Sequence, residues 1–278
     1  EDHIPNTPKQ LLIGHALGWV TIDGNKVYRP PWTYAHLPLV LGPDRSKLSK
    51  RHGATSIDEY RKDGYLPEAL FNFIALLGWS PGDDREIMSK EEMIEAFSLE
   101  KMQKSGAVFD IQKLDWMNGT YIRKLPAEDL FERAKPFLPE TYTLHPTTYN
   151  LRVIALEQPR LKKLSEIGER VDFFFKEPEY DTELLRWKKM TNEELRESLE
   201  ESRAILAGRA GKPSDLTKDS LEKVFFEAIG ERDKGKILWP LRAALTDKKA
   251  SPGPFEIIEI LGYDRSIERI DNALQRLS

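Results

Sequence analysis

The chain has 278 residues, enough for two or three domains, and 40% of them are hydrophobic, which supports a buried core. It contains no cysteine, which excludes disulfides, thiol catalysis and cysteine-ligated zinc. Its five histidines show no metal-ligand spacing, so we expect no protein-held metal. Lysine and arginine number 42 against 46 aspartate and glutamate, so the net charge of -4 gives no global case for a nucleic-acid ligand. A polyanion would need basic residues gathered on one face.

No apolar run reaches the roughly 18 residues of a membrane span. The first residues, 1–5, resemble neither a signal peptide nor a transit peptide. The expected localisation is cytoplasmic. The sequence does not begin with Met, which favours a fragment or a processed product.

The first 55 residues predict a mixed α/β segment. A proline in the first turn predicts a helix over 7–17, which Gly18 would end. The polar stretch 19–31 predicts either a hairpin or a surface insertion. Residues 34–41 are strand-like in composition.

A short basic loop follows this strand-like segment after the turn Gly42-Pro43-Asp44. The run Arg45-Ser46-Lys47-Leu48-Ser49-Lys50-Arg51-His52-Gly53 contains four lysines and arginines and one histidine. A strand that leads into a cationic loop is suited to binding polyphosphate. A solvated basic turn is the alternative interpretation.

After residue 55 the pattern becomes almost wholly helical. Ser-x-x-Glu capping boxes begin at Ser56 and Ser89. The apolar residues 69–77 predict a buried helix between Pro67 and Gly78. The aromatic residues are interpreted as core: Trp79, Trp116, Trp187, Trp239, Phe173–Phe175 and Phe225–Phe226.

Asp110 is expected to cap a helix over Ile111–Asn118, and Gly119 would end it. Further helices are expected at 127–134, 147–158, 160–175, 181–187, 191–207, 217–229, 234–245, 254–261 and 265–277. Proline-bearing joints near 125–126 and near Glu177 suggest boundaries. We therefore expect domains over 1–55, 56–125 and 126–278, the last one divided near 177.

The cationic loop resembles the KLSKR form of the lysine–serine signature of class I aminoacyl-tRNA synthetases. Collinear blocks extend this resemblance over nearly the whole chain, and they identify the family as the bacterial-type glutamyl-tRNA synthetases. The blocks are Glu1–Gln10, Tyr34–Leu39, Lys47–Ala54, Glu59–Arg61, Asp63–Leu70, Leu77–Ser80, Pro240–Thr246, Ser251–Pro252 and Arg265–Ile270.

The resemblance implies a mainly α fold. Residues 1–55 would be the end of a class I, Rossmann-like α/β catalytic domain, and 56–125 a helical stem-contact region. Residues 126–278 would be a helical anticodon-binding domain. The implied activity is that of a glutamate–tRNA ligase, a monomer that uses glutamate, ATP with Mg2+, and tRNA(Glu) and passes through glutamyl-adenylate.

The resemblance also assigns roles to residues. In carboxylate activation by ATP, charge builds on the leaving pyrophosphate, so a lysine placed there stabilises the transition state. Lys47 and Lys50 are the expected catalytic residues, with Lys50 in direct contact with pyrophosphate. The expected ATP-binding set is Lys47, Leu48, Ser49, Lys50 and Arg51.

Three residues are expected to bind tRNA. Arg160 resembles the position where arginine favours glutamate-type over glutamine-type anticodons, since a guanidinium can pair with a base edge or stack on it. Arg242 and Thr246 lie four residues apart, on one helix face, and family position suggests that they lie near the anticodon loop. A solvated helix face for Arg160 and a structural ion pair for Arg242 are the alternatives.

The family's other signature, the HIGH-like motif, is absent, so the chain resembles the C-terminal portion of the enzyme. A non-catalytic tRNA-binding module or fragment is therefore the alternative function. A glutaminyl relative is disfavoured because its anticodon region is built of β-barrels, and a queuosine-modifying ligase lacks such a region. Discrimination against tRNA(Gln) and the role of 19–31 stay open.

Activation of glutamate is expected to depend on both class I signatures, the KLSKR loop and the HIGH-like motif. The 278-residue chain alone should not activate glutamate, because only one of the two class I signatures is present in it. Glutamate-dependent ATP–pyrophosphate exchange measures this step directly. Exchange above the protein-free background would contradict the expectation.

Overall fold

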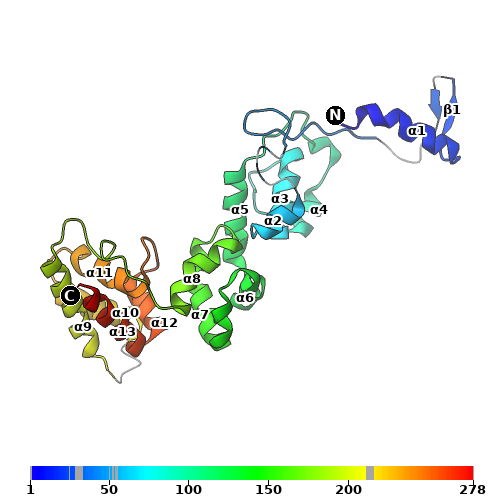
Figure 1. Cartoon of the computed structure of the whole chain (residues 1–278). Helices are drawn as coiled ribbons and strands as arrows, with labels where there is room; N and C mark the ends of the chain where they lie inside the picture. Colours follow the sequence, from blue (N-terminus) through cyan, green and yellow to red (C-terminus); the bar gives the residue numbers. More distant parts are fainter. Residues whose placement is uncertain are drawn as a thin grey trace. The chain divides into compact units, whose positions relative to one another are not determined.

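Helices account for nearly all of the regular structure, which confirms the mainly helical fold (Figure 1). The computed structural model describes residues 2–24, 26–28, 34–49, 51, 53, 56–210 and 216–277. The chain forms two units, Glu1–Tyr121 and Ile122–Ser278, each considered separately below. None of the described helices is long and apolar enough to cross a membrane.

The N-terminal helix and hairpin follow the predicted pattern. Helix α1 (Thr7–Ala16) ends just before Gly18, whose φ of +73° is a conformation that glycine adopts readily. Strands β1 (Thr21–Asp23) and β2 (Lys26–Tyr28) pair antiparallel, which confirms the hairpin interpretation for this part of 19–31. Residues 29–31 lie outside the described part of the chain.

Four further helices form the body of the first unit. Both predicted capping boxes are confirmed, because Ser56 and Ser89 exchange reciprocal hydrogen bonds with the glutamates three residues later. The main core cluster consists of Tyr60, Tyr65, Leu70, Phe73, Leu114 and Met117. The helices are α2 (Ile57–Lys62), α3 (Pro67–Gly78), α4 (Lys90–Ala96) and α5 (Ile111–Lys124).

Helix α5 corrects the predicted stop at Gly119. Asp110 caps it as expected, since its Oδ1 accepts from the amides of Gln112 and Lys113. The helix nevertheless runs through Gly119 to Lys124. A glycine within a helix costs about 1 kcal/mol relative to alanine. Burial of Ile122, which is fully inaccessible, offsets that penalty.

Trp116 and residues 34–41 give two further corrections. The Trp116 side chain is 46% exposed, so its interpretation as a core residue was wrong. Within 34–41, only Leu41 makes bridge pairs, one with Lys47 and one with Val108. A strand requires a neighbour that supplies a ladder of hydrogen bonds, and Pro38 has no N–H to donate. The apolar pattern therefore marks a packed extended segment, and the predicted strand was wrong.

The second unit consists of eight helices among its described residues, and seven of the nine predicted helices in this region are confirmed to within about two residues at each end. They are α6 (Ala127–Ala134), α7 (Thr147–Glu157), α8 (Ile167–Phe175), α9 (Asn192–Ala207), α10 (Lys218–Ile229), α11 (Gly235–Thr246), α12 (Pro254–Leu261) and α13 (Tyr263–Arg276).

Two predicted helices of this unit were wrong. The segment 160–175 becomes α-helical only at Ile167, because Leu161 is buried in extended backbone before it and Leu164–Glu166 form a 3-10 turn. Residues 181–187 form turns instead of a helix. There the Arg186 guanidinium bonds to the Met190 carbonyl, which favours a turn over a continuous helix.

A proline inside α11 is accommodated by its neighbour α9. Pro240 lacks the N–H that would bond to the carbonyl of Lys236. The Ser198 hydroxyl of α9 donates to that carbonyl instead, at 2.7 Å. Ser198 lies on the buried face of α9, so the bond satisfies a polar group inside the helix pair.

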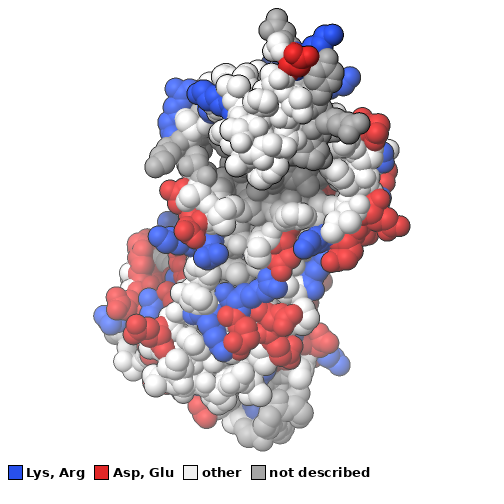
Figure 2. Space-filling model, turned by 90° about the vertical axis from the view of Figure 1, so that its right-hand side faces the viewer, with Lys and Arg blue, Asp and Glu red and all other residues white. Residues whose placement is uncertain are grey.

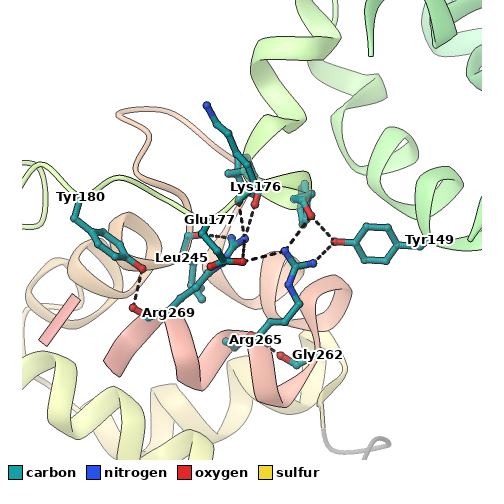
Figure 3. A network of polar contacts seen from close by, with 11 residues as sticks. Tyr149, Lys176, Glu177, Tyr180, Leu245, Gly262, Arg265 and Arg269 are labelled. Atoms are coloured by element: carbon teal, nitrogen blue, oxygen red, sulfur yellow. Dashed lines mark hydrogen bonds and ion pairs between the residues drawn. The ribbon is translucent and has the colours of Figure 1, made fainter. Parts of the chain in front are cut away.

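A buried arginine joins three helices of this unit (Figure 3). Arg269 of α13 is fully inaccessible, and its guanidinium donates to the carbonyls of Phe173 and Leu245, each at 2.6 Å. These carbonyls lie in the last turns of α8 and α11, where helices leave acceptors unpaired. Glu177 balances the charge at 3.3 Å. Burial lowers the pKa of Arg269.

We expect Arg269→Met to lower the free energy of unfolding by about 3–5 kcal/mol, because it leaves buried carbonyls without donors. Arg265 is the matched control. It lies on the same helix, is partly exposed, and donates to the Tyr149 hydroxyl and the Phe174 carbonyl. Arg265→Met should cost about 1–2 kcal/mol. Equal losses in urea unfolding would contradict the role assigned to Arg269.

Candidate functional site

The cationic loop is held at its stem by backbone hydrogen bonds. The Leu41 amide donates to Ala107 at 2.9 Å, and Leu41 accepts from Phe109 at 2.8 Å. The Leu48 amide donates to Val40 at 2.9 Å, which closes the loop on itself. The segment before α5 therefore fixes the place from which the loop projects.

Asp44 organises the loop interior. Its Oδ1 accepts from the amide and hydroxyl of Ser46, at 3.0 and 2.7 Å. Its Oδ2 accepts from Arg51 at 3.0 Å, and Arg51 also donates to the Ser46 hydroxyl at 2.6 Å. Arg45 adopts a left-handed φ of +60° in this turn. The sequence analysis treated Asp44 only as a turn residue and missed this role.

Lys47 pairs with Asp2 from the start of the chain, with 2.5 Å between Nζ and Oδ2. The hydrogen bond from Lys47 lowers the pKa of Asp2. Both side chains are more than half exposed, so another anion can compete for the lysine. Ser49 is exposed, and Lys50 lies outside the described residues.

An open hollow of about 490 Å3 adjoins Lys47. It is lined by Asp2, His3, residues 35–40 and Leu48. The His36 Nε2 atom lies 3.1 Å from the Thr7 hydroxyl. The hollow thus brings a cationic loop, two histidines and a carboxylate to one place in the first unit.

A close backbone approach at Gly106 supports the loop stem. A Cβ atom there would lie 2.8 Å from the Leu39 carbonyl oxygen and 3.1 Å from the Leu41 side chain. Any larger residue must therefore displace the stem.

Gly106→Ala should destabilise the first unit by about 1–3 kcal/mol and raise hydrogen exchange at the Leu41 amide, which bonds to the neighbouring Ala107. Gly78→Ala is the control, because a Cβ there meets nothing within 4 Å. It should leave stability unchanged or raise it by about 0.5–1 kcal/mol. If hydrogen exchange at the Leu41 amide is unaltered in Gly106→Ala, the close approach at Gly106 does not support the loop stem.

In the second unit, Arg160 contacts a buried carboxylate. It ends a short 3-10 turn after α7 and donates to Glu157 Oε1 at 3.1 Å. Glu157 is 1% exposed, and Arg170 of α8 lies 3.8 Å from its other oxygen. Burial raises the pKa of Glu157, although both arginines oppose that shift. The sequence analysis missed Glu157, although its i,i+3 spacing to Arg160 could have indicated it.

Arg242 is half-buried, and its donors close a loop. They bond to the carbonyls of Lys248 and Lys249 and to the Ser251 hydroxyl, at 3.0, 3.2 and 2.9 Å. Its guanidinium lies 4.4 Å from the ring centre of Trp239. Arg242 thus anchors the loop 247–251 through hydrogen bonds and a cation–π contact.

Thr246 shares a face with Arg242, as predicted from the spacing, and its side chain faces inward. It is 1% exposed, and its hydroxyl donates to the Arg242 carbonyl at 2.8 Å and accepts from the Lys248 amide. In this conformation the hydroxyl stabilises the end of α11.

Arg242 and Arg160 come from distant parts of the sequence of the second unit. Burial lowers the pKa of Arg242, and the positive charge of Arg160 lowers it further. The two residues are 82 positions apart in the chain, so this electrostatic influence arises only from the fold. Cations gathered by a fold form a local positive field that the net charge of a protein does not reveal.

Charges elsewhere are mixed. Figure 2 shows Lys and Arg side chains interspersed with Asp and Glu over the face in view. Lys248 pairs with Asp172 at 2.9 Å, and Lys236 pairs with Glu194 at 3.0 Å. Among the described residues, no group of three or more His, Asp or Glu could hold a metal ion.

Comparison with known proteins identifies two modules in order along the chain. Residues 1–116 match the family model described as "tRNA synthetases class I (E and Q), catalytic domain". Residues 129–274 match the model described as "Anticodon binding domain". The cationic loop lies within the first match, and both Arg160 and Arg242 lie within the second.

Similarity over the whole of this chain points to the same enzyme family. The chain is 42% identical to a glutamate–tRNA ligase of Dehalococcoides mccartyi, over all of this chain and 56% of that protein. It is 42% identical to one from Syntrophobacter fumaroxidans, over 99% of this chain and 56% of that protein. A crystal structure of a glutamate tRNA ligase from Elizabethkingia meningosepticum, in complex with its amino acid, superposes with a TM-score of 0.78 at 29% identity. This superposition covers 100% of the present chain and 56% of the Elizabethkingia chain. The present chain therefore spans about half the length of these relatives.

Proposed function

The chain belongs to the glutamyl-tRNA synthetase family of class I aminoacyl-tRNA synthetases, and on that premise we propose that it takes part in the ATP-dependent attachment of glutamate to tRNA(Glu). One observation carries the proposal. A catalytic-domain match that contains a KLSKR loop and an anticodon-domain match that contains Arg160 and Arg242 follow each other in one chain. The first domain would serve activation of the amino acid, and the second would bind the tRNA.

The cationic loop would serve the activation of glutamate. When the glutamate carboxylate attacks the α-phosphate of ATP, glutamyl-adenylate forms and pyrophosphate leaves. Lys47 and Lys50 are our proposed catalytic residues, since cations beside the leaving group stabilise the transition state. Leu48, Ser49 and Arg51 complete the proposed ATP-binding set.

The donor set of this loop fits a polyphosphate. Lys47 and Arg51 are well exposed, and their present partners, Asp2 and Asp44, are about half exposed, so phosphate oxygens can replace them. Mg2+ would arrive with ATP, where it neutralises phosphate charge.

Arg160 and Arg242 would contribute to the selection of tRNA. Arg160 has a third of its side chain exposed, and we propose that it reads the third anticodon base through its guanidinium. Arg242 would contact the anticodon loop with its remaining N–H groups. Thr246 would hold the backbone of Arg242 in place, since its hydroxyl donates a hydrogen bond to the Arg242 carbonyl.

The domain assignment and setting belong to the same proposal. We assign 1–55 to the end of the catalytic domain, 56–125 to stem contact and 126–278 to anticodon binding. We further propose a cytoplasmic monomer. The match to an anticodon-binding domain over more than half of the chain also fits a second candidate, a tRNA-binding module without catalysis.

Binding to two tRNA transcripts that differ only in the third anticodon position, C or G, tests the anticodon assignment. At fixed salt the chain should prefer the glutamate form, with C, by about 5- to 100-fold, the range of one bidentate base contact. Arg160→Gln should abolish this preference.

Lys162→Gln is the matched control, because it removes a positive charge two residues away. It should weaken binding to both transcripts equally, as expected for a phosphate contact. If Arg160→Gln also weakens both equally, Arg160 does not read the base. If neither transcript binds, the anticodon assignment fails.

A further inference from the structure

Arg160 forms an ion pair with Glu157, a residue that is almost completely buried. Glu157 is the last residue of α7 and only 1% exposed, so it can contact no ligand directly. Its Oε1 lies 3.1 Å from Arg160 Nη1, within hydrogen-bond distance. The carboxylate therefore holds Arg160 from the protein side, while a third of the arginine side chain faces solvent.

The carboxylate is itself held in place. The Nη1 atom of Arg170, in α8, lies 3.8 Å from Glu157 Oε2, and Arg170 Nη2 binds Glu166 at 3.2 Å. Glu157 Oε2 has no hydrogen-bond partner among the described residues, so it is an incompletely satisfied buried charge. The neighbouring Gln158 side chain bonds to the carbonyls of Ile122 and Leu125, both at 2.8 Å, and fixes the turn that carries Arg160.

This arrangement costs desolvation energy. A buried carboxylate loses hydration, and its ion pairs with Arg160 and Arg170, each about a third exposed, compensate for that loss only in part. Burial raises the pKa of Glu157 in spite of the two arginines, which agrees with that balance. A buried ion pair is weak evidence of a purely stabilising role, so the glutamate calls for a role besides stability.

Glu157 limits the freedom of Arg160 from the protein side. Its carboxylate accepts a hydrogen bond from the Arg160 guanidinium at 3.1 Å, and Glu157 itself is buried. A charge-assisted hydrogen bond to a fixed acceptor restricts the directions in which the remaining N–H groups of Arg160 point.

We propose that Glu157 is a positioning residue for anticodon discrimination, whose buried carboxylate holds the Arg160 guanidinium in the orientation that reads the third anticodon base. This inference rests on the proposed function, in which Arg160 contacts that base. Arg160 would select the base, and Glu157 would make the selection precise by limiting the conformations of Arg160.

The test compares Glu157→Leu with Glu166→Leu, a control that removes a carboxylate from Arg170 and from the Lys162 amide and leaves the Arg160–Glu157 pair intact. Glu157→Leu should reduce the preference for C over G by about fivefold or more, with little change in affinity for the G form. Glu157→Gln, which keeps an acceptor, should retain part of the preference. Glu166→Leu should retain all of it.

A double variant separates positioning from general damage. If Glu157 acts through Arg160, Glu157→Leu should cause no further loss of preference in an Arg160→Gln background. A second loss there, or an unchanged preference in Glu157→Leu alone, would overturn the proposal.

A measurement without tRNA distinguishes failure of this inference from failure of the proposed function. In 15N-arginine-labelled protein, the heteronuclear NOE of Arg160 Nε, assigned from Arg160→Gln, should fall in Glu157→Leu and persist in Glu166→Leu. An unchanged NOE in Glu157→Leu refutes the positioning. A lowered NOE with equal binding of both transcripts by the unmodified chain refutes base reading by Arg160, and the role in discrimination falls with it.

Discussion

The second unit depends on one buried guanidinium. Helices α8 and α11 both end inside the protein, and each leaves carbonyl groups that no residue of its own helix can satisfy. Arg269 provides donors to both ends at once, and Glu177 balances its charge (Figure 3). Only arginine offers five N–H donors in a rigid plane, so a lysine could not serve both helices. The relative placement of α8, α11 and α13 follows from this contact, and with it the placement of the loop after α11 that Arg242 anchors.

The cations of the proposed sites fall into two groups according to their partners. Lys47 and Arg51 pair with carboxylates that are about half exposed, and such solvent-screened pairs contribute little to stability, so an incoming phosphate can replace the partner. Arg160 and Arg242 are bound to groups that cannot leave, a buried carboxylate and backbone carbonyls. The first group suits a charge that must move during a reaction, and the second suits a charge that must stay still to read a base. A negative overall charge is compatible with both, because the binding cations are local.

Much of the helical framework could be predicted from local patterns. The capping boxes at Ser56 and Ser89 and the stop before Gly18 lie where expected, because caps and glycine conformations depend on a few adjacent residues. The same reasoning failed at Gly119, where burial of Ile122 outweighs the penalty for glycine in a helix. It also failed for 34–41, where composition cannot show whether a pairing neighbour exists.

The sequence by itself determined which residues carry the chemistry that we propose, since the basic loop 45–51 and the arginines at 160 and 242 are legible as residue types in a recognisable order. Only the tertiary structure decided their surroundings. The electrostatic influence of Arg160 on Arg242 and the inward direction of Thr246 depend on packing that the local sequence does not show. The burial of Glu157 depends on packing as well, since a glutamate three residues before an arginine is usually a solvated pair. Desolvation made it a fixed, buried partner, and no local pattern encodes desolvation.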